Sequence, residues 1–139
     1  VLAILQDGFP FDAVRPPVLL HDDFWCGNIL WRDETLVGVI DWEDAKLGNR
    51  YQDLAIARFD SCFIFGRETM QALTDAYSAI HPINKHTLAL WDLYAALRAA
   101  RGIPDWAIGW AEMGRPDLTE EAIWRSHRWF LDQALATLT

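Results

Sequence analysis

The sequence predicts an α+β fold that is mostly α-helical, in which a small β-hairpin is backed by about five helices. Before residue 50, short runs of aliphatic and β-branched residues alternate with turn residues, which is typical of strands. After residue 50, apolar residues recur at helical spacing almost to the end of the sequence. The 139 residues, 52% of them hydrophobic, are enough for one domain with its own core, so we expect a single domain over residues 1–139.

The first third of the sequence predicts the strands. Prolines and the pair Asp7-Gly8 mark its loops, and the apolar runs between them are too short for helices. The expected elements, in order, are a helix end at residues 1–6, a buried strand at 18–20, a hairpin with strands at 29–32 and 36–40 around Asp33-Glu34-Thr35, and a loop at 42–49 with Gly48 as its hinge.

The remaining two thirds predict helices. Pro82 ends one of them, because proline restricts the residue before it, and Asn84 is a suitable N-cap for the next. Asp117 and Glu120 have the spacing of a capping box before the last helix. The expected helices are 51–63, 67–80, 84–100 and 118–138, with a short helix or an ordered loop over 103–116.

Composition and charge exclude several classes of function. The net charge of −8 argues against a nucleic-acid-binding protein and favours a cationic small-molecule partner. No uncharged apolar run approaches the length of a membrane span, and no signal-peptide pattern is present. The two cysteines give no disulfide framework, so we expect a cytoplasmic protein.

Three side chains before the hairpin and one after it form a catalytic pattern. His21, Asp23 and Asn28 have the spacing of a phosphotransferase loop, and Asp41 follows on a later loop. In that chemistry one carboxylate accepts or orients the proton of the attacking hydroxyl, while an amide and a second carboxylate hold Mg²⁺. The hairpin reverses the chain between Asn28 and Asp41, so we expect these two residues to be neighbours and to bind the metal.

At these residues the chain resembles the aminoglycoside phosphotransferase and choline kinase-like family. The resemblance rests on His21-Asp22-Asp23 with Asn28, on Ile40-Asp41-Trp42, and on Gly48 with Asp53-Leu54-Ala55, where Asn49 replaces a usual aspartate. It implies the C-terminal lobe of a protein-kinase-like fold that uses ATP and Mg²⁺ to phosphorylate a hydroxyl of a small molecule. Asp22 departs from the family pattern, which has glycine at this position.

The resemblance also implies a role for each residue. Asp23 is the catalytic base, Asn28 and Asp41 bind Mg²⁺ and nucleotide, and His21 and Asp53 support the loop structurally. Glu43 and Asp44 are either neighbours of the metal or acceptor, or part of a solvated loop. Two of the eight tryptophans, Trp106 and Trp110, lie in a looser segment and are either core residues or the lining of a pocket for an ammonium group.

Other interpretations of the same residues remain. Taken alone, Asp23 has the properties of a helix or turn cap, and Cys26 those of a buried or half-buried structural thiol. His21, Asp23 and Cys26 together suggest a zinc site, although no paired CxxC or HExxH spacing accompanies them. Asp22 keeps open a catalytically inactive, regulatory pseudokinase. A protein kinase is disfavoured by Trp42, which stands where such enzymes carry phenylalanine.

The sequence lacks the features of a nucleotide-binding lobe. There is no G-x-G-x-x-G motif, and neither lysine, Lys46 or Lys85, lies in a predicted strand. We therefore expect the N-terminal lobe to lie outside these 139 residues. The present chain alone is then expected to be inactive and to expose an apolar face that favours self-association.

Overall fold

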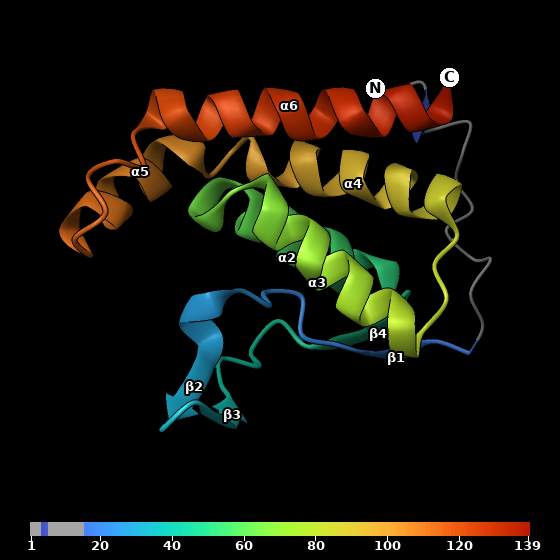
Figure 1. Cartoon of the computed structure of the whole chain (residues 1–139), viewed down its shortest axis with the longest axis horizontal. Helices are drawn as coiled ribbons and strands as arrows, with labels where there is room; N and C mark the ends of the chain where they lie inside the picture. Colours follow the sequence, from blue (N-terminus) through green and yellow to red (C-terminus); the bar gives the residue numbers. More distant parts are fainter. Residues whose placement is uncertain (1–3, 6–15) are drawn as a thin grey trace.

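The computed structural model describes residues 4–5 and 16–139 and has the mostly helical α+β composition that the sequence predicts. Of the helix end expected at residues 1–6, only Ile4 and Leu5 lie within the described residues, and both are helical. In Figure 1, α6 lies along α4, α2 and α3 lie on the other side of α4, and the strands form the end farthest from α6. The helices are α2 (Tyr51–Phe65), α3 (Arg67–Ile80), α4 (Lys85–Ala99), α5 (Ile103–Glu112) and α6 (Glu120–Leu138).

Strand β1 (Val18–Leu20) pairs antiparallel with β4 (Lys46–Gly48), with Val18 opposite Gly48. The predicted loop over 42–49 is therefore wrong at its end, and Gly48 is a strand residue instead of a hinge. A Cβ at Gly48 would lie 2.6 Å from the terminal methyl of Leu20, so a larger residue there would require the Leu20 side chain to shift. The prediction that β1 is buried holds only for Leu20, because among the described residues β1 pairs only with β4 and its other side chains are exposed.

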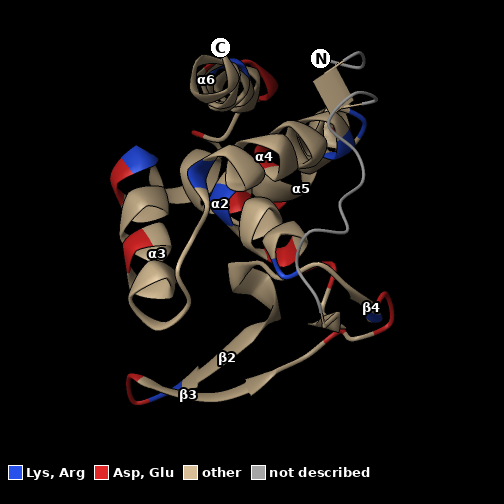
Figure 2. Ribbon diagram, turned by 90° about the vertical axis from the view of Figure 1, so that its right-hand side faces the viewer, with Lys and Arg blue, Asp and Glu red and all other residues tan. Residues whose placement is uncertain are grey.

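The predicted hairpin is confirmed. Strands β2 (Ile29–Arg32) and β3 (Thr35–Val39) pair antiparallel around a two-residue turn, and Thr35 already belongs to the second strand. Both turn residues, Asp33 and Glu34, have positive φ angles, which is the backbone of the type I′ turns that connect hairpins. Figure 2 shows this hairpin projecting away from the helices, with the acidic turn at its tip.

The predicted helices are confirmed with small changes at their ends, and residues 103–112 are helical. Asn84 caps α4 as predicted, since its Oδ1 accepts a hydrogen bond from Thr87 N at 2.9 Å. The predicted capping box at α6 is wrong. Thr119 is the N-cap and accepts from Ala122 N at 3.2 Å, whereas Asp117 forms an ion pair with Arg115.

The main core lies where α2, α4, α5 and α6 meet. One buried ion pair crosses it, since Arg58 on α2 donates two hydrogen bonds to Asp92 on α4, at 3.1 and 2.9 Å. Gln133 on α6 donates a further bond to Asp92, so this buried carboxylate is fully paired. Of the tryptophans expected in the core, Trp91 is buried, and Trp124 and Trp129 are partly buried against it.

Within residues 4–5 and 16–139, no helix is both long enough and apolar enough to cross a membrane.

Candidate active site

The loop between β1 and β2 is held to the helices by Asp53. This carboxylate lies in the first turn of α2, and its two oxygens accept hydrogen bonds from the backbone N–H groups of His21 at 2.7 Å and Asp22 at 2.9 Å. Charge-assisted bonds of this kind are stronger than neutral ones. Because α2 is packed in the core, the loop that carries Asp23 has a fixed position relative to the helices.

His21 joins this loop to the segment that carries Asp41. Its Nδ1 accepts from Asp23 N at 3.3 Å, and its Nε2 lies 2.8 Å from Ile40 O. Because Nδ1 accepts a hydrogen bond and Nε2 faces a carbonyl oxygen, the ring carries a proton on Nε2. The ring is buried and packs against Trp42, with ring centroids 4.6 Å apart. His21 therefore lies between the two loops as a bridge, which is the structural role predicted for it.

Asn28 lies beside Asp23 and Asp41. Its Nδ2 donates to the backbone oxygen of Asp23 at 2.9 Å and to Asp23 Oδ2 at 3.2 Å. Its backbone oxygen accepts from Ile40 N at 3.0 Å, which brings the neighbouring Asp41 next to it. The structure thus places the backbones of Asn28 and Asp41, the predicted metal-binding pair, next to each other. The Asn28 Oδ1 accepts no hydrogen bond from the part of the chain that the structure describes.

The chemistry of this donor set fits Mg²⁺. Asn28 Oδ1 and the exposed Asp41 carboxylate are both oxygen ligands, and Mg²⁺ is usually held by one or two carboxylates together with phosphate oxygens and waters. Zinc fits less well. Among residues 4–5 and 16–139, no three His, Cys, Asp or Glu side chains converge on one point, so the alternative site of His21, Asp23 and Cys26 is not formed there.

Asp22 has the backbone conformation for which glycine is favoured, with φ 66°, and the residue is only 9% exposed. Its carboxylate contacts Lys46 Nζ at 2.7 Å and accepts a hydrogen bond from Gln52 Nε2. Arg98 Nη1 donates to the Asp22 backbone oxygen at 2.6 Å. The extra charge beside Asp23 is therefore neutralised by a lysine and an arginine.

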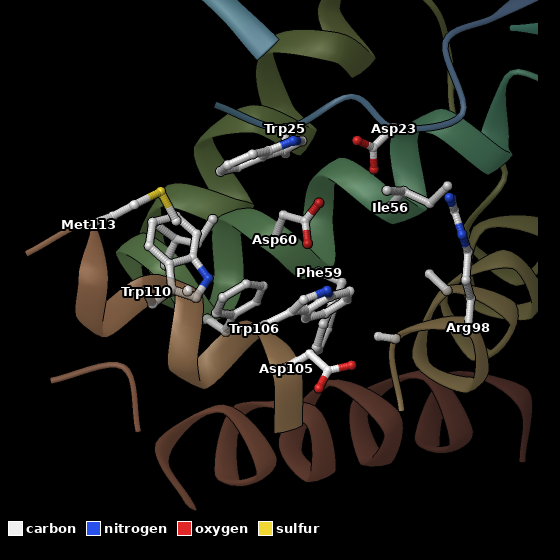
Figure 3. A pocket seen from close by; sticks show the side chains of 15 residues that line it. Asp23, Trp25, Ile56, Phe59, Asp60, Arg98, Asp105, Trp106, Trp110 and Met113 are labelled. Atoms are coloured by element: carbon white, nitrogen blue, oxygen red, sulfur yellow. The ribbon is translucent and has the colours of Figure 1, made fainter. Parts of the chain in front are cut away.

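A cavity of about 370 Å³ opens beside Asp23, between the β1–β2 loop, α2, α4 and α5 (Figure 3). Both Trp106 and Trp110 line it, together with Trp25 from the β1–β2 loop. Trp25 packs edge-on against Trp110 with ring centroids 5.6 Å apart, and Trp106 stacks on Phe63 at 6.0 Å. The remaining lining residues are Ile56, Phe59, Asp60, Ile64, Ala95, Arg98, Ala99, Asp105, Gly109 and Met113.

Asp60, an acid on α2 that the sequence did not single out, projects into this cavity between Trp25 and Trp106 (Figure 3). Burial, together with the nearby charge of Asp23, raises the pKa of Asp60 to about 8, although Arg98 opposes this shift. The signal in the sequence was an acid at helical spacing from Ile56 and Ile64, within the apolar part of a helix.

Gly27 was also missed. A Cβ there would lie 2.2 Å from the Trp25 indole, so only glycine lets this ring fold over the loop toward the cavity.

Three other candidate residues lie apart from the cavity lining. Glu43 and Asp44 are exposed in the turn closed by Ala45 N and Trp42 O, and neither lines the cavity. Cys26 is exposed, so the expectation of a buried or half-buried structural thiol is wrong. The pKa of its thiol is raised by desolvation and by the negative charge of Asp60, which is the opposite of what an activated nucleophile needs.

The contacts of Asp22 predict that Asp22→Gly destabilises the protein. Glycine relieves the backbone conformation but loses the bonds to Lys46 and Gln52, and we expect a net loss of about 1–3 kcal/mol in the free energy of unfolding. Asp33→Gly is the matched control, because Asp33 also has a positive φ but is exposed in the hairpin turn. This change should be neutral or slightly stabilising. Urea unfolding measures both, and equal effects would show that the contacts of Asp22 contribute nothing.

The raised pKa of Asp60 predicts a pH dependence of stability. Between its ordinary pKa of 3.8 and the folded value of about 8, the folded state binds a proton that the unfolded state has lost. The free energy of unfolding should therefore decrease as the pH rises through this window. Asp60→Asn should remove this slope, so its stability advantage over the native protein grows from pH 4 to pH 8. Parallel stability curves for the two proteins would contradict the shift.

Comparison with known proteins identifies the family of this chain. The model of the phosphotransferase enzyme family matches residues 2–91, which is more than half of the chain and includes both motif segments and the whole of α2 and α3. No solved structure matches this chain. The chain therefore belongs to the phosphotransferase enzyme family, the aminoglycoside phosphotransferase and choline kinase-like proteins that its catalytic-loop sequence resembles.

Proposed function

We propose that this protein transfers the γ-phosphate of ATP to a hydroxyl group of a small molecule, with cationic acceptors such as aminoglycosides or amino alcohols as the first candidates. Family membership supports phosphotransferase chemistry in general. The observation that carries the finer proposal is the position of Asp23. Its carboxylate is oriented by Asn28 Nδ2 at 3.2 Å and lines a cavity large enough for a small acceptor.

In this proposal Asp23 orients the acceptor hydroxyl and takes up its proton. The hydroxyl oxygen forms a bond to the γ-phosphorus while the bond from that phosphorus to the β-γ bridging oxygen breaks, and ADP leaves. Asn28 keeps the carboxylate of Asp23 turned toward the acceptor. Positioning and electrostatic stabilisation supply most of the catalysis in such reactions, so the fixed loop is as important as the base.

Asn28 and Asp41 are the residues proposed to hold Mg²⁺, which when bound neutralises the charge of the nucleotide phosphates. The amide oxygen of Asn28 has no protein donor within the described residues, and Asp41 is exposed at the start of its loop. His21 keeps the two loops together through its bonds to Asp23 N and Ile40 O.

The strands are proposed to meet a nucleotide lobe, with the present chain as the C-terminal lobe of a protein-kinase-like fold. Several large apolar side chains of this region are exposed, which is more than an isolated surface usually carries. Without such a lobe, this surface favours self-association and half of the nucleotide site is missing. The exposed side chains are Val18, Leu19, Leu30, Trp31, Leu36, Val37, Ile40, Trp42 and Leu47.

Replacement of Asp23 tests the proposed reaction. In the full-length protein, Asp23→Asn should lower kcat by at least roughly a hundredfold, the lower end for a general base, with little change in the affinity for Mg-ATP. Asp44→Asn is the control, because it removes an exposed carboxylate from the neighbouring turn and should leave kcat unchanged. Coupled ADP release measures both variants. Near-normal turnover by Asp23→Asn would reject Asp23 as the base.

A further inference from the structure

The walls of the cavity are apolar and aromatic. Trp25, Phe63, Trp106 and Trp110 form one continuous aromatic cluster, with neighbouring ring centroids 5.6 to 6.1 Å apart. A molecule with many hydroxyl and amino groups would lose water on entering this space and find few partners for those groups. Burial of unpaired polar groups is unfavourable, so the walls disfavour polyhydroxylated polyamines such as aminoglycosides.

The acidic side chains of the cavity favour a cation. Asp23, Asp60 and Asp105 line it, whereas Arg98 is its one positively charged lining residue among those that the structure describes. Arg98 is already engaged by Asp22, with Nη1 at 2.6 Å from the backbone oxygen and 3.7 Å from Oδ1. The negative charge of the cavity is therefore only partly compensated.

Asp60 is the carboxyl group best placed to bind that cation. It projects from α2 between the rings of Trp25 and Trp106 (Figure 3), and it accepts no hydrogen bond from any residue in the described ranges. Asp23 is committed to Asn28, and Asp105 is exposed at the start of α5. Aromatic faces attract cations, so the rings on either side of Asp60 add to the same preference.

We propose that Asp60 is the specificity-determining residue of the acceptor site, binding the single ammonium group of an alcohol whose body is apolar and contains a ring. The hydroxyl of this acceptor lies at Asp23, and its ring lies against Trp106 and Trp110. This inference rests on the proposed kinase function and narrows its acceptor class to lipophilic monoamine alcohols. The volume of about 370 Å³ is at the lower end for ligand pockets, in keeping with an acceptor of modest size.

Proton release gives this proposal a distinctive signature. With the cavity empty, Asp60 is largely protonated at neutral pH, because burial and the charge of Asp23 raise its pKa to about 8. A bound ammonium group favours the ionised carboxylate. Binding of the monoamine near pH 7 should therefore release close to one proton from Asp60, whereas an uncharged alcohol should release none.

Calorimetry on the full-length protein tests the binding preference with three probes: 2-amino-1-(2-naphthyl)ethanol, 1-(2-naphthyl)ethanol, which lacks the amine, and kanamycin. We expect the monoamine to bind at least roughly tenfold more tightly than either of the others, the usual scale for a hydrogen bond to a charged group. Repeating the titration in buffers of different ionisation enthalpy counts the released protons. Absent binding of the monoamine, or equal binding of kanamycin, would overturn the proposal.

Two matched variants locate the effect. Asp60→Asn keeps the shape of the side chain and should abolish both the preference for the amine and the proton release, while the neutral alcohol binds as before. Asp105→Asn removes an exposed carboxylate at the same cavity and should change the affinity for the amine by less than roughly threefold. Equal losses in the two variants would reject Asp60 as the specificity residue. If Asp60→Asn does not fold, the affinities of the three probes and the number of protons released by the native protein still test the proposal.

A turnover assay separates this inference from the proposed function. If the monoamine binds as expected but is not phosphorylated with Mg-ATP, and no other alcohol is, the kinase proposal fails and the binding site stands. If other alcohols are phosphorylated with dependence on Asp23 while the monoamine does not bind, the acceptor proposal alone fails.

Discussion

The carboxylate of Asp53 is the group on which the rest of the site depends. It accepts hydrogen bonds from two consecutive backbone N–H groups of the β1–β2 loop, at 2.7 and 2.9 Å, from a position in the first turn of a core helix. A surface loop would otherwise be the most mobile part of the fold. Through this contact Asp23 is positioned by α2, the same helix that carries Asp60 into the cavity. The proposed base and the proposed cation-binding group therefore depend on the same helix.

The second half of the site is positioned by the hairpin and by His21. Strands β2 and β3 return the chain so that Ile40 N bonds to Asn28 O, and His21 bridges Asp23 N and Ile40 O. Asp22, the residue that keeps open an inactive pseudokinase, has an ion-paired carboxylate and a glycine-like backbone conformation. Its charge is therefore paired with Lys46, and its side chain fits the backbone position at which the family has glycine.

The sequence predicted those features that depend on local spacing. Helical periodicity predicts the five helices, and the spacing of Asp23, Asn28 and Asp41 around a hairpin predicts which backbones meet. The sequence did not predict features that arise from packing between distant segments. Asp60 is, in the sequence, only an acid among apolar residues, and it lines a cavity because α5 packs beside α2. Strand β4 forms because β1 lies beside it. Capping at Thr119 was missed because Asp117, which has the expected spacing, is bound to Arg115 instead.

The proposed function requires that Asn28 and Asp41 hold Mg²⁺ beside Asp23, the proposed base. A crystal structure of the full-length protein with Mg²⁺ and a non-hydrolysable ATP analogue would show the metal and its ligands. We expect a metal ion about 2.0–2.1 Å from the Asn28 Oδ1 and from a carboxylate oxygen of Asp41, with the γ-phosphate facing the cavity at Asp23. A metal–nucleotide complex that contacts neither Asn28 nor Asp41 would contradict it.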